Sequence, residues 1–280
     1  MPPVTPPLLV IDGDNLAHRA YHSTPKSVTG ANGLPINAVV GFFSMLLRIW
    51  EEEKPRAVFV AWDTLGVDTY RSKLWPPYQT GRVFDREIVL QLDLLPKICE
   101  GFGFGVGKEA GFEADDFMAA AAIEEVRLGG TCLLLTTDKD SYQLVNEHVT
   151  VLAPRRGTRE LDRIGPAEVV ERMGVLPEQV PDFKALAGDS SDKIPGLSGI
   201  GPKSAAALLL KHATLENVLS GWSKPAEAEL ALMFREVVTM RTYAVVTLPP
   251  SGPPDFEGGA AVLRHLGADR LAERVEQMGR

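Results

Sequence analysis

The stretch LLVID, residues 8–12, consists of four apolar residues followed by an aspartate. The same pattern returns in AVFVAWD, residues 57–63, and in TCLLLTTDKD, residues 131–140. Short apolar runs of this kind are typical of strands buried on both faces of a parallel sheet. Helix-like stretches at residues 38–50 and 86–99 lie between these runs. The alternation predicts an α/β fold with a mainly parallel, twisted sheet flanked by helices.

Acidic residues follow each predicted strand, and ligands of open parallel sheets bind at that edge. The stretch GFEADDFMAA, residues 111–120, adds three more acids at the start of a helix predicted to run to about residue 126. Acids at a helix N-terminus also serve as caps and interact favourably with the helix dipole, so this stretch alone supports a structural role equally well. The acids of both groups are Asp12, Asp63, Glu113, Asp115, Asp116, Asp138 and Asp140.

The loop GDSSDKIPG, residues 188–196, adds Asp189 and Asp192 after an apolar helix predicted at 183–187. If the nine acids converge, each pair about 4 Å apart costs about 4 kcal/mol at an effective dielectric constant near 20. A few such pairs would cancel a domain stability of about 5–15 kcal/mol, so convergence requires cations. A ligand set of oxygens, without His or Cys, favours Mg²⁺ or Mn²⁺ over Zn²⁺.

The net charge of -8 argues at first against nucleic acid, whose binding proteins usually carry a basic face. Of the 37 acidic residues, however, nine belong to the proposed site, which leaves 28 against 29 Lys and Arg. Basic residues also form two groups, although a solvated surface explains each group alone equally well. They are Arg155, Arg156, Arg159 and Arg163, and Arg71, Lys73, Arg82 and Arg86.

The stretch GLSGIGPKSAAALLLKH, residues 196–212, has the helix-hairpin-helix pattern, which grips a DNA backbone without reading bases. Pro202 suits the first position of a helix whose N-terminus can bind a phosphate, and Lys203 adds a positive charge. The same turn can direct carbonyl groups at a monovalent cation. A glycine-rich connector without a ligand is the alternative.

The remaining composition indicates a soluble protein with a real core, because 45% of the 280 residues are hydrophobic. Cys99 and Cys132 stand singly in apolar surroundings and are predicted to be reduced core residues. No segment approaches the roughly 18 consecutive apolar residues of a membrane span, and the first residues lack the pattern of a signal peptide. We therefore expect a cytoplasmic protein that does not associate with membranes.

Seven stretches, in this order and spacing, resemble the bacterial and phage 5′ nuclease family, which includes flap endonucleases and the 5′-nuclease domain of DNA polymerase I. They are VIDGDNLAHRAYH, GLPINAVVGFFSML, YQTGR, GFEADDFMAA, TTDKDSYQLV, ALAGDSSDKIPG and GLSGIGPKSA, and the resemblance covers about residues 8–245. The fold it implies is a PIN-like nuclease core at 1–162, a helical arch at about 64–85 and a helix-hairpin-helix (helix-three-turn-helix) subdomain at 163–248. Residues 249–280 are expected to form a linker and a tail that packs back on the core as one more helix.

The activity that the resemblance implies is metal-dependent hydrolysis of DNA at 5′ flaps and 5′ ends, by a two-metal-ion mechanism with Mg²⁺ or Mn²⁺. Such an enzyme, expected as a monomer at the nucleoid, would act in Okazaki-fragment processing and repair, with a DNA polymerase as functional partner and RNA primers as a further substrate. The implied ligands of the inner metal cluster are Asp12, Asp63, Glu113, Asp115, Asp116 and Asp138, and those of the second are Asp140, Asp189 and Asp192.

The DNA contacts implied by the resemblance lie in the arch and the hairpin. Arg71 and Arg82 match arch cations that neutralise the scissile phosphate, and with Asp116 they are the expected catalytic residues. Trp75 and Tyr78 stack on bases or merely pack the arch, two readings with equal support. The other implied DNA contacts are Arg19, Lys73, Gln79, Gly199, Gly201, Lys203 and Ser204, and the carbonyls of Leu197 and Ile200 are the implied ligands of K⁺.

The chain departs from the family pattern at Gln79, where the arch motif normally has lysine. Glutamine can donate a hydrogen bond to a phosphate but cannot supply charge, so we expect slower chemistry or a stronger demand for metal, with Lys73 as a substitute. Two other functions remain open. A DNA-structure binding protein with weakened nuclease activity is one, and a haloacid dehalogenase-type phosphatase, suggested by the spacing in VIDGDN, is the other.

Overall fold

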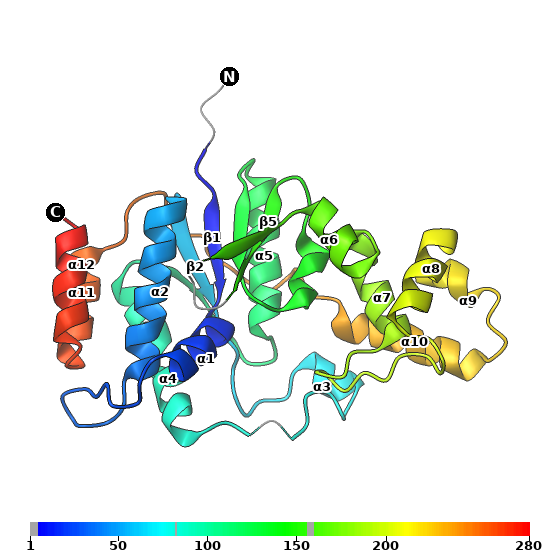
Figure 1. Cartoon of the computed structure of the whole chain (residues 1–280), viewed down its shortest axis with the longest axis horizontal. Helices are drawn as coiled ribbons and strands as arrows, with labels where there is room; N and C mark the ends of the chain where they lie inside the picture. The colour runs from blue at the N-terminus through cyan, green and yellow to red at the C-terminus, as the bar shows by residue number, and fades with distance from the viewer. Residues whose placement is uncertain (1–4, 82, 156–159) are drawn as a thin grey trace.

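The computed structural model describes residues 5–81, 83–155 and 160–280, and a six-stranded sheet lies at the centre of these residues (Figure 1). The strand order is β3-β2-β1-β4-β5-β6; the first five strands are parallel, and β6 is antiparallel to β5. This arrangement confirms the predicted fold class. The strands are β1 (Leu8–Asp12), β2 (Ala57–Ala61), β3 (Gly105–Gly107), β4 (Cys132–Leu135), β5 (Val149–Pro154) and β6 (Leu161–Ile164).

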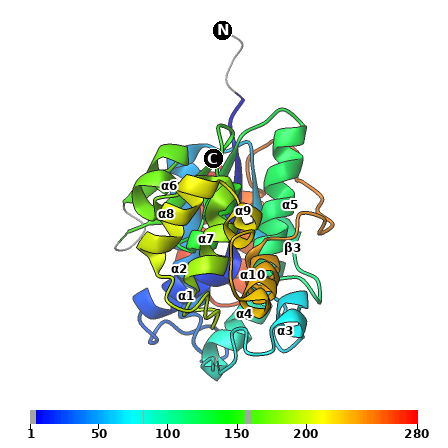
Figure 2. The ribbon, with the colours of Figure 1, turned by 90° about the vertical axis from the view of Figure 1, so that its right-hand side faces the viewer.

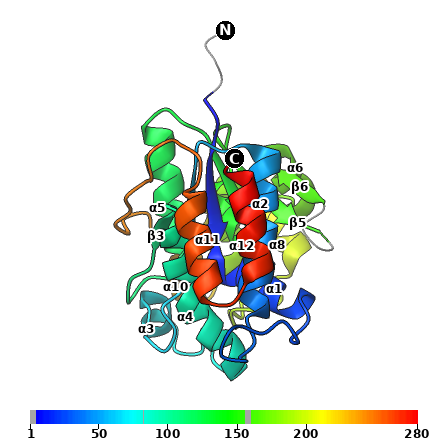
Figure 3. The same cartoon turned by 90° about the vertical axis from the view of Figure 1, so that its left-hand side faces the viewer.

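Alternating residues of the central strand β1 serve two different cores, because successive side chains of a strand point to opposite faces. Leu9 and Ile11 pack on one face under five helices, of which α11 and α12 are outermost in Figure 3. Leu8 and Val10 pack on the other face under α5 (Ala114–Arg127). The helices of the first face are α1 (Gly13–Ser23), α2 (Asn37–Glu53), α4 (Arg86–Gly101), α11 (Phe256–His265) and α12 (Asp269–Met278).

A helical region lies beside α5 and continues the core of that face, since the buried side chains of Ala205 and Phe234 belong to the same cluster as those of α5. Figure 2 shows these helices in front of the sheet. They are α6 (Pro166–Met173), α7 (Val180–Ala187), α8 (Pro202–His212), α9 (Leu215–Leu219) and α10 (Pro225–Val238), with 3-10 turns η1 (Lys139–Leu144) and η2 (Pro177–Gln179).

The segment at 64–85, expected as a helical arch, is helical only at α3 (Tyr70–Leu74) among its described residues. Turns and extended chain make up the rest. The segment lies against α10, where the rings of Trp75 and Phe234 meet edge to face with centroids 5.1 Å apart. It is therefore a strap packed on the helical region rather than a pair of free-standing helices.

Two expectations about the C-terminal half need correction. The sequence of residues 227–246 favours one continuous helix, but the helix ends at Val238. Beyond Thr239 the backbone N–H groups have acceptors outside the helix: Met240 N donates to Gln143 Oε1 (2.9 Å) and Arg241 N to Asp116 Oδ1 (2.8 Å). The tail holds two helices instead of one, and Leu263 and Val275 bury their side chains in the core beside α2 and α4. Within the residues described, we find no helix with the length and apolarity that crossing a bilayer demands.

Candidate active site

Carboxylates from four elements meet at the carboxyl edge of the sheet, because β2, β1 and β4 are adjacent and parallel. Asp12 is the last residue of β1, and Asp63 and Asp138 follow β2 and β4 within three residues. The start of α5 contributes Glu113 and Asp115. The pocket they form has a volume of about 310 Å³ and is lined by Asp12, Asp14, Asn15, His18, Asp63, Leu65, Gln79, Phe84, Glu113, Ala114, Asp115 and Asp138.

The sharp turn between β1 and α1 orients the first of these acids. A Cβ on Gly13 would lie 2.6 Å from the Trp62 ring and 2.7 Å from the carbonyl oxygen of Ala61, so only glycine fits between the strands. The Asp12 carboxylate then caps α1 by accepting a hydrogen bond from Asn15 N (3.0 Å), and it accepts another from Thr136 Oγ1 (2.8 Å). These bonds fix the carboxylate in the pocket floor.

Asp14 is a pocket residue that sequence reasoning missed. Its Oδ2 accepts a hydrogen bond from Asp63 N (2.8 Å), and Asp63 Oδ1 in turn accepts one from Ala114 N (2.7 Å) at the start of α5. Three elements are thereby joined through two acids. The sequence feature that could have identified Asp14 is its spacing from Asp12 in VIDGDN. That spacing was interpreted only as the nucleophile pair of a phosphatase.

The pocket disfavours charge on its acids. Burial, opposed by the hydrogen bonds from Asn15 and Thr136, raises the pKa of Asp12 from 3.8 to about 7. Burial and neighbouring carboxylates also hold the pKa of Asp14 and of Asp115 well above the ordinary value, and burial raises that of Glu113. A hard cation would remove this penalty, and the oxygen-only acids of the pocket suit Mg²⁺ or Mn²⁺.

A second cluster consists of Asp140, Asp189 and Asp192, whose nearest carboxylate oxygens all lie within 4.8 Å of one another. The two ends of the loop that carries Asp189 and Asp192 lie very close together, since a Cβ on Gly196 would lie 2.4 Å from Gly188 N. Burial and Asp189 raise the pKa of Asp192. These three acids could also hold a cation.

Lys184 is the counter-ion of this second cluster. Its buried ammonium group pairs with Asp140 and lies 2.6 Å from Asp189 Oδ2. Burial raises the pKa of Asp189, but the hydrogen bonds from Lys184 and Ser191 together outweigh burial and lower it to about 2. The sequence reading overlooked Lys184, since it treated residues 183–187 simply as an apolar helix.

Gln79 connects the two acid groups. It lines the first pocket, and its Nε2 donates to Asp192 Oδ1 (3.0 Å) and to the hydroxyl of Tyr78 (2.7 Å). A further cavity of about 610 Å³ shares Asn15 and Asp138 with the first pocket. It extends past Asp189 to Pro202, the first residue of α8, and also contains Lys139, Arg172 and Lys184.

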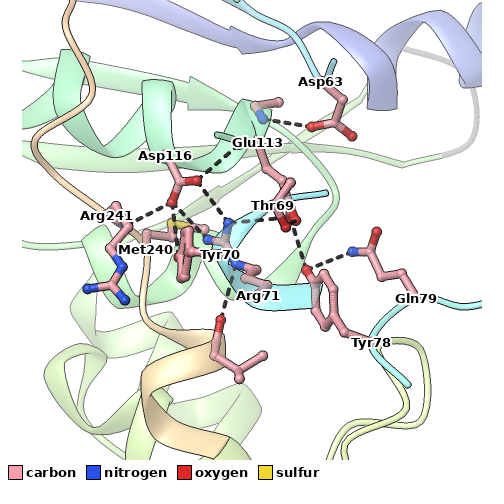
Figure 4. Close-up of polar contacts among 12 residues, drawn as sticks. Asp63, Thr69, Tyr70, Arg71, Tyr78, Gln79, Glu113, Asp116, Met240 and Arg241 are labelled. Carbon is pink, nitrogen blue, oxygen red and sulfur yellow. Dashed lines mark hydrogen bonds and ion pairs between the residues drawn. The ribbon is translucent and has the colours of Figure 1, made fainter. Parts of the chain in front are cut away.

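Asp116 and Arg71 lie behind the pocket, where Figure 4 shows them facing each other. Arg71 donates to both carboxylate oxygens of Asp116 at 2.9 Å, and both side chains are almost fully buried. Asp116 also accepts hydrogen bonds from the backbone N–H groups of Glu113 (3.0 Å) and Arg241 (2.8 Å). The structure thus does not bring Asp116 to the pocket or Arg71 to its mouth, contrary to their expected roles as metal ligand and phosphate contact.

The two aromatic residues of the strap are packed. Tyr78 is 7% exposed, and its hydroxyl donates to Glu113 Oε2 (3.0 Å), as Figure 4 shows. Trp75 Nε1 donates to the carbonyl oxygen of Lys193 (2.9 Å), while its ring contacts Phe234. These contacts favour the packing reading over base stacking.

Several predicted basic contacts have intramolecular partners. Arg19 donates to the carbonyl oxygens of Pro154 (3.1 Å) and Arg155 (2.9 Å), so it holds the end of β5. Arg155 pairs with Asp162 and Arg163 with Glu53, whereas Lys73 is exposed. Arg82, Arg156 and Arg159 lie outside the described residues.

The hairpin between α7 and α8 presents the predicted backbone contacts at the surface. Gly199, Lys203 and Ser204 are exposed and Gly201 is half-buried. The amide of Ile200 donates to the carbonyl oxygen of Leu197 (3.0 Å), which gives the turn its compact form. These residues surround the N-terminus of α8, where free N–H groups favour an anion.

Comparison with known proteins identifies the same two parts. Residues 7–174 match the family model of the 5′-3′ exonuclease N-terminal resolvase-like domain, and residues 175–251 match that of the 5′-3′ exonuclease C-terminal SAM fold. The boundary at 174/175 lies twelve residues after the one expected from the sequence.

Curated relatives include three bacterial DNA polymerases I. That of Mycobacterium leprae is 36% identical over 88% of this chain and 29% of its own length, and that of Deinococcus radiodurans is 35% identical over 90% and 26%. The thermostable enzyme of Thermus thermophilus is 35% identical over 92% and 32%. The chain therefore spans about a quarter to a third of the length of these relatives.

Solved structures share the fold. The 5′-exonuclease of bacteriophage T5 with bound divalent metal ions (zinc) superposes with a TM-score of 0.69 at 19% identity, over 98% of this chain and 99% of the phage protein. The catalytic core of Rad2 in complex with a DNA substrate gives a TM-score of 0.59 at 14% identity, over 97% and 93%. With two consecutive family models and several polymerase relatives in agreement, the chain belongs to the 5′-3′ exonuclease family.

Proposed function

We propose that the chain hydrolyses DNA phosphodiester bonds at 5′ flaps and 5′ ends with two or more Mg²⁺ or Mn²⁺ ions. One observation carries the proposal: two groups of carboxylates converge at the sheet edge and are joined through Gln79 and a shared cavity. Acids placed so closely, several with raised pKa, are suited to holding cations rather than to general acid catalysis alone. A phosphodiester is the substrate that such a pair of sites serves best.

The residues divide between two metal positions. Asp12, Asp63, Glu113, Asp115 and Asp138 would hold the first cation, with Asp14 beside them, and Asp140, Asp189 and Asp192 the second. When bound, the cations lower the pKa of water and stabilise negative charge on the leaving oxygen. Asn15 and Thr136 keep Asp12 oriented for this task, and Arg71 with Asp116 keeps the start of α5 in place.

The duplex would bind along the larger cavity. This cavity begins at Asp138 in the carboxylate pocket, passes Lys139 and Arg172, and ends at Pro202 where α8 begins. The hairpin residues Gly199 and Lys203 would hold one phosphate through backbone N–H groups and an ammonium charge, with K⁺ as a companion ion at Leu197 and Ile200. The strand held there would present a further phosphodiester to the acids.

The relatives support a proposal about the biological setting. Because these are DNA polymerases I, we place the chain beside a DNA polymerase in Okazaki-fragment processing and excision repair, at the nucleoid. RNA primers joined to DNA are a second substrate of the same chemistry, and the active unit is a monomer.

Cleavage of a 5′-labelled flap duplex tests the proposal. The wild type, Asp115→Asn and the exposed control Glu147→Gln are compared with Mg²⁺, with Mn²⁺ and with chelator. We expect metal-dependent release of the flap by the wild type and the control, and a loss of at least a hundredfold in Asp115→Asn. Asp115 is a better choice than Asp116, whose replacement would disturb folding. Tight flap binding without cleavage in either metal would leave a DNA-structure binding protein.

A further inference from the structure

The mouth of the carboxylate pocket needs a cation that a phosphate can reach, because the acids around it repel a polyanion. Two basic side chains that contact the acid clusters are already paired: Arg71 with Asp116 and Lys184 with Asp140 and Asp189. Both are buried. Gln79, the strap residue that lines the pocket, is neutral and donates a hydrogen bond to Asp192, so it cannot attract a phosphate by charge.

Lys193 is held close to Gln79, a residue that lines this pocket, by contacts between the 188–196 loop and the strap. Its Nζ donates to Thr80 Oγ1 (2.9 Å) and lies 3.6 Å from the position that a Cβ on Gly81 would take. Its carbonyl oxygen accepts from Trp75 Nε1 (2.9 Å), and the adjacent Asp192 accepts from Gln79. The ammonium group therefore lies one residue along the strap from Gln79 and one along the loop from a predicted metal ligand.

Two properties of Lys193 indicate that its charge is held in a fixed position rather than spread over a mobile surface side chain. Its backbone is left-handed, with φ of 57°, a conformation that is unfavourable for a residue with a Cβ. Its hydrogen-bond acceptor is a neutral hydroxyl, and among the residues described no carboxylate forms an ion pair with it. The charge is thus held in position without being neutralised, as a phosphate-binding group requires.

We propose that Lys193 contacts a phosphate of the bound strand beside the carboxylates and supplies from the facing loop the charge that Gln79 lacks. The inference rests on the proposed function for the identity of the ligand, a DNA phosphodiester. It replaces Lys73, the substitute expected from the sequence, since Lys73 is exposed on α3 and has no contact that directs it to the mouth among the described residues.

The test compares Lys193→Gln with the matched control Lys97→Gln, at an exposed lysine on α4. Glutamine at 193 keeps a donor for Thr80 but removes the charge. With chelator present, the salt dependence of flap binding is measured, and loss of one phosphate contact should lower the slope of log K against log salt by about 0.9. In Mg²⁺, single-turnover cleavage should slow by about tenfold to a hundredfold in Lys193→Gln and stay within twofold in Lys97→Gln.

A double variant that moves the positive charge from position 193 to position 79 tests whether the activity can be rescued. Gln79→Lys in the Lys193→Gln background should recover most of the lost rate and the lost salt slope, and Lys193→Arg should retain both. Equal slopes and rates for Lys193→Gln and the wild type would overturn the inference, as would a defect that Gln79→Lys does not relieve. If no variant cleaves but the slope still falls in Lys193→Gln alone, the phosphate contact stands and the nuclease proposal fails.

Discussion

The guanidinium of Arg71 and the carboxylate of Asp116 form a two-armed ion pair, with Nη1 to Oδ2 and Nη2 to Oδ1 distances of 2.9 Å. Arg71 Nε also donates to the carbonyl oxygen of Val237 (3.1 Å) at the end of α10. One buried pair thereby joins the strap, the start of α5 and the helical region. Its role is to hold the walls of the acid pocket together.

Removal of one member of this pair should destabilise the protein. Arg71→Met leaves the Asp116 carboxylate buried without its main partner, so we expect a loss of about 3–5 kcal/mol in the free energy of unfolding. Arg163→Met, which removes an arginine that is 56% exposed and pairs with Glu53, should cost less than about 1 kcal/mol. Urea unfolding measures both, and equal effects would contradict the structural role.

The metal-free protein should lose stability as pH rises. The folded pKa of Asp12, about 7, lies above the ordinary 3.8, so the stability contributed by the protonated group is full below pH 3.8 and is lost through pH 7. Asp14 and Asp115 shift in the same direction. Thermal unfolding with chelator should show a Tm several degrees lower at pH 8 than at pH 5.5. Asp12→Asn should make the Tm less dependent on pH. A Tm that rises between pH 5.5 and pH 8 would contradict the raised pKa of these acids.

Lys184→Met should lower the stability of the protein in chelator but increase the stabilisation that Mn²⁺ provides. The substitution leaves Asp140 and Asp189 without their counter-ion, so the metal-free protein should lose roughly 3 kcal/mol. Because a divalent cation no longer competes with the ammonium group, Mn²⁺ should raise the Tm more in the variant than in the wild type. Lys224→Met, at an exposed pair with Glu227, is the control. An unchanged response to Mn²⁺ would show that Lys184 does not occupy the cation position.

Asp14→Asn tests whether the residue missed by sequence reasoning belongs to the metal site. Asparagine keeps an acceptor for Asp63 N but removes a buried charge, so the Tm in chelator at pH 8 should rise. The affinity for Mn²⁺, measured by calorimetry, should fall about tenfold. If the affinity is unchanged, Asp14 only positions Asp63.

The sequence alone was sufficient for the sheet and for the edge at which the acids gather. Apolar runs that end in Asp12, Asp63 and Asp138 and alternate with helix-like stretches favour buried parallel strands, and parallel strands bring their carboxyl ends to one edge. The hairpin turn could also be predicted from the sequence, because its glycines and Pro202 act through local backbone geometry. In each case the determining interactions are local or repeat with a fixed period.

Tertiary structure decided which acids face the pocket and which cations remain available. Asp115 and Asp116 are neighbours in sequence, but a helix turns by about 100° per residue, so one enters the pocket and the other meets Arg71. Asp14, Lys184 and Lys193 acquire their places only when β2, η1 and the strap approach. A side chain's partner across such distances depends on how whole elements pack, and no local pattern in the chain encodes it.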